Sequence, residues 1–282
     1  MTNICTFFST KIKDLIPKSD FTEIRLRVGK PLCIKKRGQV LTPNNAYIPT
    51  ASDINETMER ISSHSFYAYE TELAQGYITL PGGHRVGVAG QVVVENGIVR
   101  TWRYISAINI RIAHSVIGCA DAVLPQIKHS GSIYHTMIIA PPGCGKTTLL
   151  RDIVRQISNE GITVGLADER SEVAGCYQGV PQNDVGLCTD VIDGCPKDVA
   201  MTMLLRSMSP DVIAVDELGG EKDAHAVQTI LNAGVKILCT VHGNNTEDIK
   251  KNPTLAKLLQ AGVFEKFVVL GSGCRVLGVF DH

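Results

Sequence analysis

The segment APPGCGKTT, residues 140–148, combines small residues, glycines, a lysine and two threonines in an order suited to phosphate binding. Residues 140–147 fit seven of the eight positions of the phosphate-loop pattern G-x-x-x-x-G-K-[ST], with alanine where the first glycine is expected. The glycines permit backbone angles that turn N–H groups toward phosphate oxygens, the lysine supplies charge to the β and γ phosphates, and the first threonine can ligate Mg²⁺. We therefore predict ATP binding by Ala140, Pro141, Pro142, Gly143, Cys144, Gly145, Lys146, Thr147 and Thr148.

An acidic pair further along the chain supports this prediction. Four apolar residues, 212–215, precede Asp216 and Glu217. An acid at the end of a neighbouring parallel strand would hold Mg²⁺ together with Thr147, and a second acid beside it can orient and deprotonate water. We assign these two roles to Asp216 and Glu217, respectively. The spacing from Lys146 leaves room for one intervening strand and two helices.

Two more predicted strands end in polar residues. Asp168, Glu169 and Glu172 follow one of them, and Thr240 and His242 close another. The carboxyl ends of parallel strands are where ligands bind in α/β sheets. Glu169 is thus a rival to Glu217 as the catalytic base, with Glu172 as a further candidate. His242 is predicted to sense the γ-phosphate or to position water.

Several classes of nucleotide enzyme fit less well. A small-molecule kinase usually has an arginine-rich lid, and none is visible. Residues 216–219 fit the DxxG pattern of GTPases, but no NKxD motif follows. A nucleic-acid motor is not expected, because the formal net charge is zero and only 5% of residues are aromatic. A mechanical ATPase fits best, and the alternatives are a nucleotide-gated scaffold with negligible turnover or, against the charge balance, a nucleic-acid motor.

The predicted elements fall into two groups. Residues 1–115 favour a smaller α+β domain: two short strands around Gly38, a helix over 52–63, and antiparallel hairpins over 76–99. Residues 116–282 alternate between strands and helices, which predicts a RecA-like α/β domain with a parallel sheet covered by helices on both faces. The expected helices begin at 146, 197 and 223, and a terminal hairpin turns near 271–273.

Cysteine usage and hydropathy indicate the compartment in which the protein works. Nine cysteines without a CxxC pair indicate reduced thiols in a cytosolic protein, and the spacing of Cys176, Cys188 and Cys195 does not fit a zinc site. No uncharged apolar run approaches the ~20 residues of a membrane-spanning helix, so we expect no direct membrane insertion. Cys144 lies beside Lys146, and we expect its alkylation to inhibit the enzyme unless nucleotide protects it.

Residues 204–245 resemble the core of the secretion ATPases of type II systems, type IV systems and pili. Those proteins have an arginine ahead of Pro-Asp, a strand ending in glutamate and a Thr-x-His box, and Arg206, Glu217 and His242 occupy these positions. Residues 23–40 resemble the first strands of their N-terminal, PAS-like domain. Arg85 and Arg111 fall where that domain has arginines facing the nucleotide. The resemblance implies that Arg85, Arg111 and Arg206 neutralise charge on the transferring phosphoryl, from the same or a neighbouring subunit.

The segments EIRLRVGKPL, APPGCGKTTLLRD, ADERSEVAG and VDELGGEKD together are similar to the stage III sporulation protein AA family of endospore-forming bacteria. The Ala-Pro-Pro start of the loop, Asp216 in place of a glycine and a shorter N-terminal region distinguish this group from the wider secretion ATPases. The resemblance implies a cytoplasmic ATPase on the mother-cell side of the channel to the forespore. It also implies membrane proteins encoded with it as partners, and a homohexamer.

Overall fold

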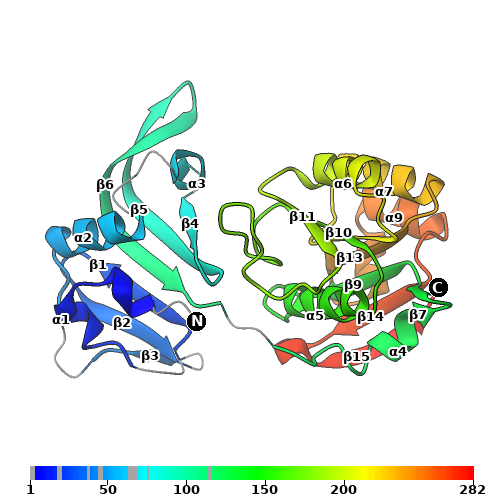
Figure 1. The fold of residues 1–282 in the computed structure, drawn as a ribbon, viewed down its shortest axis with the longest axis horizontal. Coiled ribbons are helices and arrows are strands. Elements are labelled where there is room, and N and C mark those ends of the chain that lie inside the picture. The colour runs from blue at the N-terminus through cyan, green and yellow to red at the C-terminus, as the bar shows by residue number, and fades with distance from the viewer. Residues whose placement is uncertain are drawn as a thin grey trace. The chain divides into compact units, whose positions relative to one another are not determined.

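The computed structural model describes residues 4–17, 21–36, 39–43, 47–62, 69–74, 76–113 and 116–282, without the side chain of Thr71. The chain divides into two compact units, residues 1–114 and 115–282, and each is described by itself (Figure 1). The boundary predicted from the sequence lies between residues 115 and 116. Within the described residues, no helix is long and apolar enough to cross a membrane.

The N-terminal unit contains a six-stranded antiparallel sheet in the order β3-β2-β1-β6-β5-β4. Its strands are β1 (Glu23–Arg27), β2 (Lys30–Lys36), β3 (Gln39–Leu41), β4 (Tyr77–Leu80), β5 (His84–Glu95) and β6 (Ile98–Arg111). Side chains alternate across β1, where Ile24 and Leu26 are buried on the core face. The two hairpins formed by β4, β5 and β6 agree with the prediction for residues 76–99. The predicted turn at Gly38 lies outside the described residues.

Short helices cover the apolar face of this sheet. They are η1 (Ile4–Phe7), α1 (Thr10–Lys13), α2 (Ala51–Ile61) and α3 (Glu70–Ala74). Thr50 and Asp53 form a capping box, so α2 begins one residue before the predicted start. Ile54 and Met58 of α2 then pack on Ile108 and Ile110 of β6 within one apolar cluster. The predicted end of this helix at Ser63 lies outside the described residues.

The C-terminal unit contains a seven-stranded sheet in the order β11-β10-β12-β13-β9-β14-β15. The first six strands in this order are parallel, and β15 is antiparallel to β14. Their bounds are β9 (Thr136–Ala140), β10 (Val164–Asp168), β11 (Thr189–Asp193), β12 (Val212–Val215), β13 (Lys236–His242), β14 (Lys266–Leu270) and β15 (Val276–Asp281). The central strands β9, β10 and β12 are buried at every position, as expected for a sheet covered on both faces.

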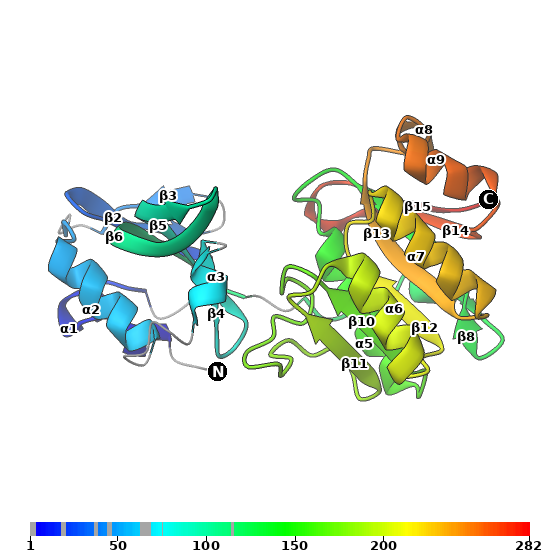
Figure 2. The same ribbon diagram turned by 90° about the horizontal axis from the view of Figure 1, so that it is seen from above.

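Helices pack on both faces of this sheet (Figures 1 and 2). One apolar cluster contains residues of α5 (Lys146–Asn159) and α4 (Leu124–Ile127). The other contains residues of α6 (Lys197–Ser207), α7 (Glu221–Asn232), α8 (Thr246–Lys250) and α9 (Pro253–Gln260). A small hairpin of β7 (Lys128–His129) and β8 (Ser132–Ile133) precedes β9. The α/β architecture predicted from the alternating pattern is confirmed.

The structure differs from the prediction in three elements of the C-terminal unit. Strand β11 adds a second strand between α5 and β12, where one was expected, and its sequence TDVID is too polar to signal a strand. Helices α8 and α9 were not predicted, because each spans eight residues or fewer. The strand that ends before Asp216 is also not adjacent to β9, because β13 lies between them.

Candidate functional site

The predicted phosphate loop connects β9 to α5. Ala140 is the last residue of β9, is fully buried, and pairs in register with His242 of β13, so alanine suits this strand position. Gly143 and Gly145 have φ angles of +75° and +91°, in the left-handed region that favours glycine. Because α5 begins directly at Lys146, its free backbone N–H groups lie at the loop, where they suit a phosphate.

Lys146 is folded back into the loop. Its side chain is only 5% exposed, and its Nζ atom donates to the carbonyl oxygens of Ala140 (3.3 Å) and Pro141 (3.4 Å). It also lies 3.0 Å from Nδ1 of His242. Burial lowers the pKa of Lys146, and the nearby carboxylates of Asp216 and Glu217 oppose this shift. The amine is thus held beside the loop by two long hydrogen bonds to carbonyl oxygens and by the contact with His242, which phosphate oxygens could replace.

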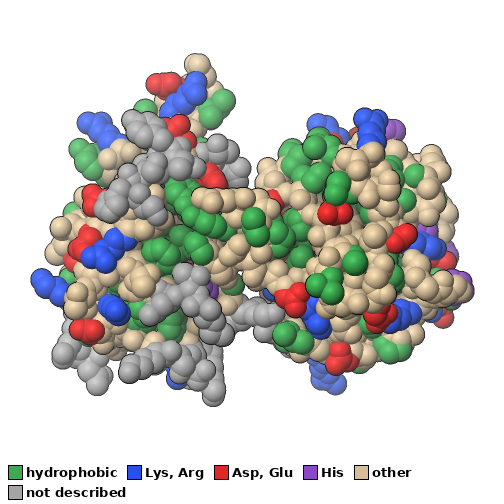
Figure 3. All heavy atoms as spheres, viewed as in Figure 1, with side chains coloured by type: hydrophobic (Ala, Val, Ile, Leu, Met, Phe, Trp, Pro, Cys, Tyr) green, Lys and Arg blue, Asp and Glu red, His purple; other side chains and the backbone are tan. Residues whose placement is uncertain are grey.

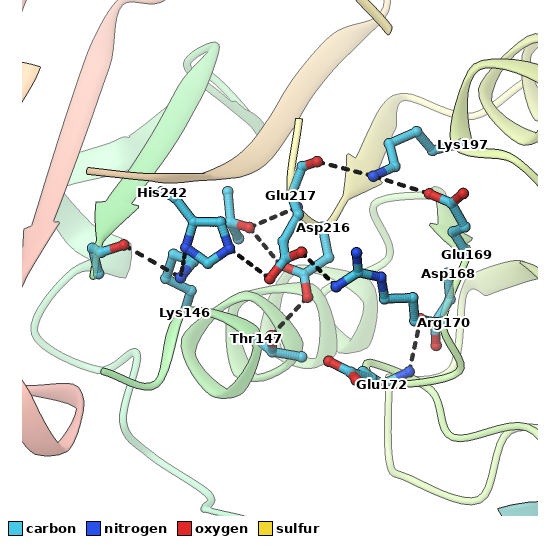
Figure 4. Close-up of polar contacts among 12 residues, drawn as sticks. Lys146, Thr147, Asp168, Glu169, Arg170, Glu172, Lys197, Asp216, Glu217 and His242 are labelled. Atoms are coloured by element: carbon cyan, nitrogen blue, oxygen red, sulfur yellow. Dashed lines mark hydrogen bonds and ion pairs between the residues drawn. The ribbon is translucent and has the colours of Figure 1, made fainter. Parts of the chain in front are cut away.

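Two oxygen-bearing side chains that could bind a metal ion, those of Thr147 and Asp216, meet beside the phosphate loop. The Thr147 hydroxyl donates to Oδ2 of Asp216 at 2.6 Å, although β13 separates the strands β9 and β12 (Figure 4). From β13, the Thr240 hydroxyl donates to the other Asp216 oxygen and accepts the backbone N–H of Glu217 at 2.8 Å. A hydroxyl and a carboxylate are hard oxygen ligands of the kind that Mg²⁺ prefers. Thr147 and Asp216 therefore fit the predicted magnesium role.

Both the backbone and the side chain of Glu217 are fixed by hydrogen bonds. Its φ angle of +57° lies in the left-handed region, and its backbone carbonyl accepts Lys197 Nζ at 2.9 Å. The carboxylate contacts His242 Nε2 at 2.9 Å and accepts from Arg170 at 2.9 Å (Figure 4). Since Lys146 donates to Nδ1 of His242, the ring proton belongs on Nε2, which then donates to Glu217. A continuous path of hydrogen bonds thus joins the lysine of the predicted phosphate loop to the candidate base.

The acids after β10 have other partners. Glu169 forms an ion pair with Lys197 at 2.9 Å, which makes it the counterion of that lysine. Asp168 is buried and accepts the backbone N–H groups of Glu172, Val173 and Ala174, so it organises the loop after β10. Burial raises the pKa of Asp168 despite these three donors. Glu217 is the candidate base that bonds directly to Thr240 and His242, whereas Glu169 is connected to it through Lys197.

Two members of the site were not identified from the sequence. Arg170 and Lys197 line one small cavity together with Asp216, Glu217 and the acidic loop 168–172. Arg170 lies inside the acidic segment DERSEV, where a lone arginine among acids could have drawn attention to it. Lys197 follows a proline at the start of α6, and nothing in its local sequence distinguishes it from a surface lysine.

Among the residues that the structure describes, the contacts of this network do not include the candidate arginine Arg206. Arg206 is exposed in the last turn of α6, roughly 13 Å along the helix from Lys197 at 1.5 Å per residue. The structure therefore does not bring it to the site of its own chain. Arg85 and Arg111 belong to the N-terminal unit, where they pair in register on β5 and β6. The Arg85 guanidinium stacks 3.7 Å from the ring centroid of Tyr77.

A cavity of about 840 Å³ lies in the N-terminal unit, lined by residues of α2, α3 and β6. Its lining is mostly apolar, with Glu70, Arg100 and Arg103 among the exceptions. Among its described lining residues, no group of acids lies with a threonine or histidine as at the phosphate loop. We therefore place the chemistry at the phosphate loop, where a shallow site is expected because backbone groups do the binding.

The chain matches known proteins over most of its length. The model of the family "Sporulation stage III, protein AA" matches residues 4–282. The stage III sporulation protein AA of Bacillus subtilis (strain 168) is 42% identical over 257 residues, which cover 89% of this chain and 82% of that protein. The uncharacterized protein ycf45 of Porphyra purpurea is 32% identical over 59% of this chain, which spans 29% of that longer protein.

Solved structures show the same fold at low sequence identity. The pilus retraction motor PilT, crystallised with bound ADP, superposes with a TM-score of 0.62 at 16% identity, over 92% of this chain and 76% of PilT. The ATPase DotB of Legionella pneumophila gives a TM-score of 0.59 at 16% identity, over 88% of this chain and 71% of DotB. An N-terminal antiparallel sheet followed by a mostly parallel α/β unit is thus an architecture shared with secretion ATPases.

Proposed function

The chain belongs to the sporulation stage III protein AA family, and we propose that it is a Mg²⁺-dependent ATP hydrolase that powers or gates a secretion-type channel between mother cell and forespore. The observation that carries this proposal is the hydrogen-bonded path Lys146–His242–Glu217, joined through Thr240 to Asp216 and Thr147. It supports the proposal because it joins the first turn of α5 to the carboxyl ends of β12 and β13, where a phosphate-binding cation, magnesium ligands and a base would all be needed.

Each residue has a defined task in the proposed reaction. Lys146 leaves the Ala140 and Pro141 carbonyls to bind the β and γ phosphates, and the N–H groups of the loop complete the cradle. Thr147 and Asp216 hold Mg²⁺, which, when bound, neutralises charge on the phosphate oxygens. Glu217 polarises the attacking water, and Arg170 and His242 fix its carboxylate. His242 senses the γ-phosphate because it loses its bond to Lys146 when the lysine turns to the nucleotide.

The proposed active assembly is a homohexamer. Arg206 cannot reach the site of its own chain, so it would act on a neighbouring copy, and Arg85 and Arg111 are further candidates. The outer surface of α6 supports a contact of this kind: Val199 is 44% exposed and Met203 49% exposed, one helical turn apart. Figure 3 shows hydrophobic side chains gathered on the C-terminal unit where Figure 1 places α6. On the mother-cell side, in the cytoplasm, the ring would dock to membrane proteins of the channel that are encoded with it.

The test is phosphate release by the full-length chain, measured across protein concentration with and without Mg²⁺. Wild type should hydrolyse ATP with a rate per subunit that rises with concentration as the ring assembles. Lys146→Ala should lose binding and turnover, whereas Glu217→Gln should retain binding, seen as an ATP-induced rise in Tm, and lose turnover. Equal phosphate release by all three proteins would refute hydrolysis at this site.

A nucleotide-gated scaffold is the second candidate function. The contacts of Glu217 favour this function. Its carboxylate already bonds to Arg170 and His242, so it is less available to activate a water molecule. The scaffold predicts an ATP-induced rise in Tm without turnover, even when the membrane partners are present. Sizing by light scattering with and without ATP, run beside the turnover assay, separates a ring motor from a monomeric switch.

A further inference from the structure

Two cysteines from distant parts of the sequence lie against the first turn of α5. Cys119 belongs to the turn before α4, and Cys274 ends the short 3₁₀ turn η3 (Ser272–Cys274) between β14 and β15. The Cys119 sulfur lies 3.7 Å from the carbonyl oxygen of Thr148, and the Cys274 sulfur 3.6 Å from that of Gly145. Since Gly145 and Thr148 are three residues apart, both sulfurs lie beside the same helical turn.

The two thiols also contact each other. The Cys119 thiol donates a hydrogen bond to the Cys274 sulfur, which lowers the pKa of Cys274 to about 7 and raises that of Cys119. Both residues are half-buried and free, and both pack against the apolar cluster under α5. A partly accessible sulfur with substantial thiolate character beside a second thiol is the arrangement in which disulfides form and break.

The turn that carries Cys274 also supports the phosphate loop. The backbone N–H of Cys274 donates to the carbonyl oxygen of Cys144 at 3.0 Å. A Cβ atom placed on Gly145 would lie 2.9 Å from the Cβ atom of Cys274, so the loop and the turn are in close contact there. Any displacement of Cys274 is therefore transmitted to the loop residues that bind phosphate.

We propose that Cys119 and Cys274 form a reversible disulfide, a modification site whose oxidation weakens nucleotide binding by the phosphate loop. The oxidant is a low-molecular-weight disulfide. The Cys274 thiolate attacks one of its sulfurs, forming a mixed disulfide and releasing one thiolate. Cys119 then loses its proton to that thiolate and attacks the Cys274 sulfur, which releases a second small thiolate that takes up a proton from water. Two protein thiols are oxidised to one disulfide, and one small disulfide is reduced to two thiols.

The direction of the effect follows from geometry. A disulfide brings the sulfurs to about 2.05 Å, far closer than a thiol–thiol hydrogen bond, so the turn that carries Cys274 has to shift toward Cys119. We expect the hydrogen bond from Cys274 to the Cys144 carbonyl to be lost. One such bond, at about 1 kcal/mol, corresponds to about fivefold weaker ATP binding. By linkage, bound ATP shifts the pair toward the reduced form by the same factor. This coupling rests on the proposed function, whereas disulfide formation does not.

The experiment incubates the full-length chain in buffers of defined oxidised-to-reduced glutathione ratio, with and without ATP. Free thiols are then alkylated, and peptides are identified by mass spectrometry. The proposal expects a linked Cys119–Cys274 peptide that reverses with excess reduced glutathione and needs a more oxidising buffer when ATP is present. The affinity for a fluorescent ATP analogue should fall about fivefold on oxidation in wild type and stay constant in Cys119→Ser.

Cys188→Ser serves as the matched control, because it removes another half-buried thiol and should leave the linked peptide unchanged. Separate alkylation of Cys119 and Cys274 in the most oxidising buffer would overturn the proposal, as would a link between Cys144 and Cys274. Equal ATP affinity of the oxidised and reduced forms would overturn the coupling. If the reduced chain bound no nucleotide at all, the proposed function would fail. The presence or absence of the linked peptide would still show whether the disulfide forms.

Discussion

The Thr240 hydroxyl of β13 joins the two acids that follow β12, Asp216 and Glu217. It donates to a carboxylate oxygen of Asp216 and accepts the backbone N–H of Glu217, and Thr240 itself is fully buried. Because a buried hydroxyl that makes both bonds fixes its partners at once, the candidate magnesium ligand and the candidate base depend on a single side chain of the intervening strand.

This relationship predicts the effect of Thr240→Val, which preserves shape and removes both hydrogen bonds. The Glu217 N–H would be left without an acceptor, so the free energy of unfolding should fall by about 1–3 kcal/mol. Turnover should fall more than ATP affinity, because Lys146 and the loop are untouched. Steady-state kinetics of Thr240→Val beside Thr240→Ser, which retains the hydroxyl, provide the check. Equal turnover of the two variants would show that the hydroxyl is not needed.

The ion pair of Glu169 with Lys197 predicts which acid is the base. Glu217→Gln should lower single-turnover hydrolysis by at least about 10²-fold, the usual contribution of a general base. Glu169→Gln should retain turnover within about tenfold of wild type, because the loss of a counterion disturbs the site only indirectly. Rapid-quench measurement at saturating ATP gives both rates. A larger loss for Glu169→Gln than for Glu217→Gln would reverse the assignment.

Asp152 of α5 predicts a pH-dependent contribution to stability. It is 3% exposed and accepts from Ala120 N–H at 2.8 Å, from Arg155 at 2.7 Å and from Gln156 at 3.1 Å. Burial is the largest single influence and raises its pKa, but these hydrogen bonds together outweigh burial and leave the pKa lowered. Since the folded pKa lies below the unfolded value of about 3.9, the carboxylate stabilises the fold above that pH and stops doing so as pH falls through the folded pKa.

The test of this prediction is urea unfolding of wild type and Asp152→Asn between pH 7 and pH 3.5. At pH 7 the variant should be about 2–3 kcal/mol less stable, as expected for hydrogen bonds to a buried charge. The difference should shrink below about pH 4. Asp14→Asn, at an exposed position after α1, should show no such difference. A gap between wild type and Asp152→Asn that stays constant down to pH 3.5 would contradict the account.

Cys144 provides a probe of loop occupancy. Its thiol is half-buried within the loop, so alkylation by iodoacetamide should place a bulky group where phosphate binds and abolish ATP binding. Saturating MgATP should slow the modification of Cys144, measured by peptide mass spectrometry. The Cys144→Ala variant should no longer be inhibited by the reagent. Modification of Cys144 at the same rate with and without nucleotide would mean that the nucleotide does not cover the loop.

A mixing experiment tests whether an arginine acts across subunits. Arg111→Ala and Lys146→Ala should each have low turnover as pure proteins. A ring that contains both carries some interfaces with an intact loop from one chain and an intact arginine from its neighbour. The mixture should therefore hydrolyse ATP faster than either variant alone. Turnover of the mixture equal to the average of the two would exclude a contribution of Arg111 to a neighbouring site.

Much of the C-terminal architecture could be predicted from the sequence, because its signals are local. The helix at Lys197–Ser207 and the strands ending at Asp168 and His242 agree closely with the predicted ranges. The loop at 140–147 was recognisable because glycine, lysine and threonine have fixed positions relative to a strand and a helix. Strand β11 and the helices α8 and α9 lacked such signals, since they are short and their burial depends on elements distant in sequence.

The sequence by itself determined the chemical inventory: a phosphate loop, an acid pair, a Thr-x-His segment and the strand ends that carry them. Tertiary structure alone decided how these groups are connected. It placed β13 between β9 and β12, so Thr240 and His242 link the loop to the acids, and it brought Arg170 and Lys197 to Glu217 while leaving Arg206 at the far end of α6. The physical reason is that side-chain hydrogen bonds act over about 3 Å between strands whose order in the sheet is fixed by long-range packing rather than by any local pattern.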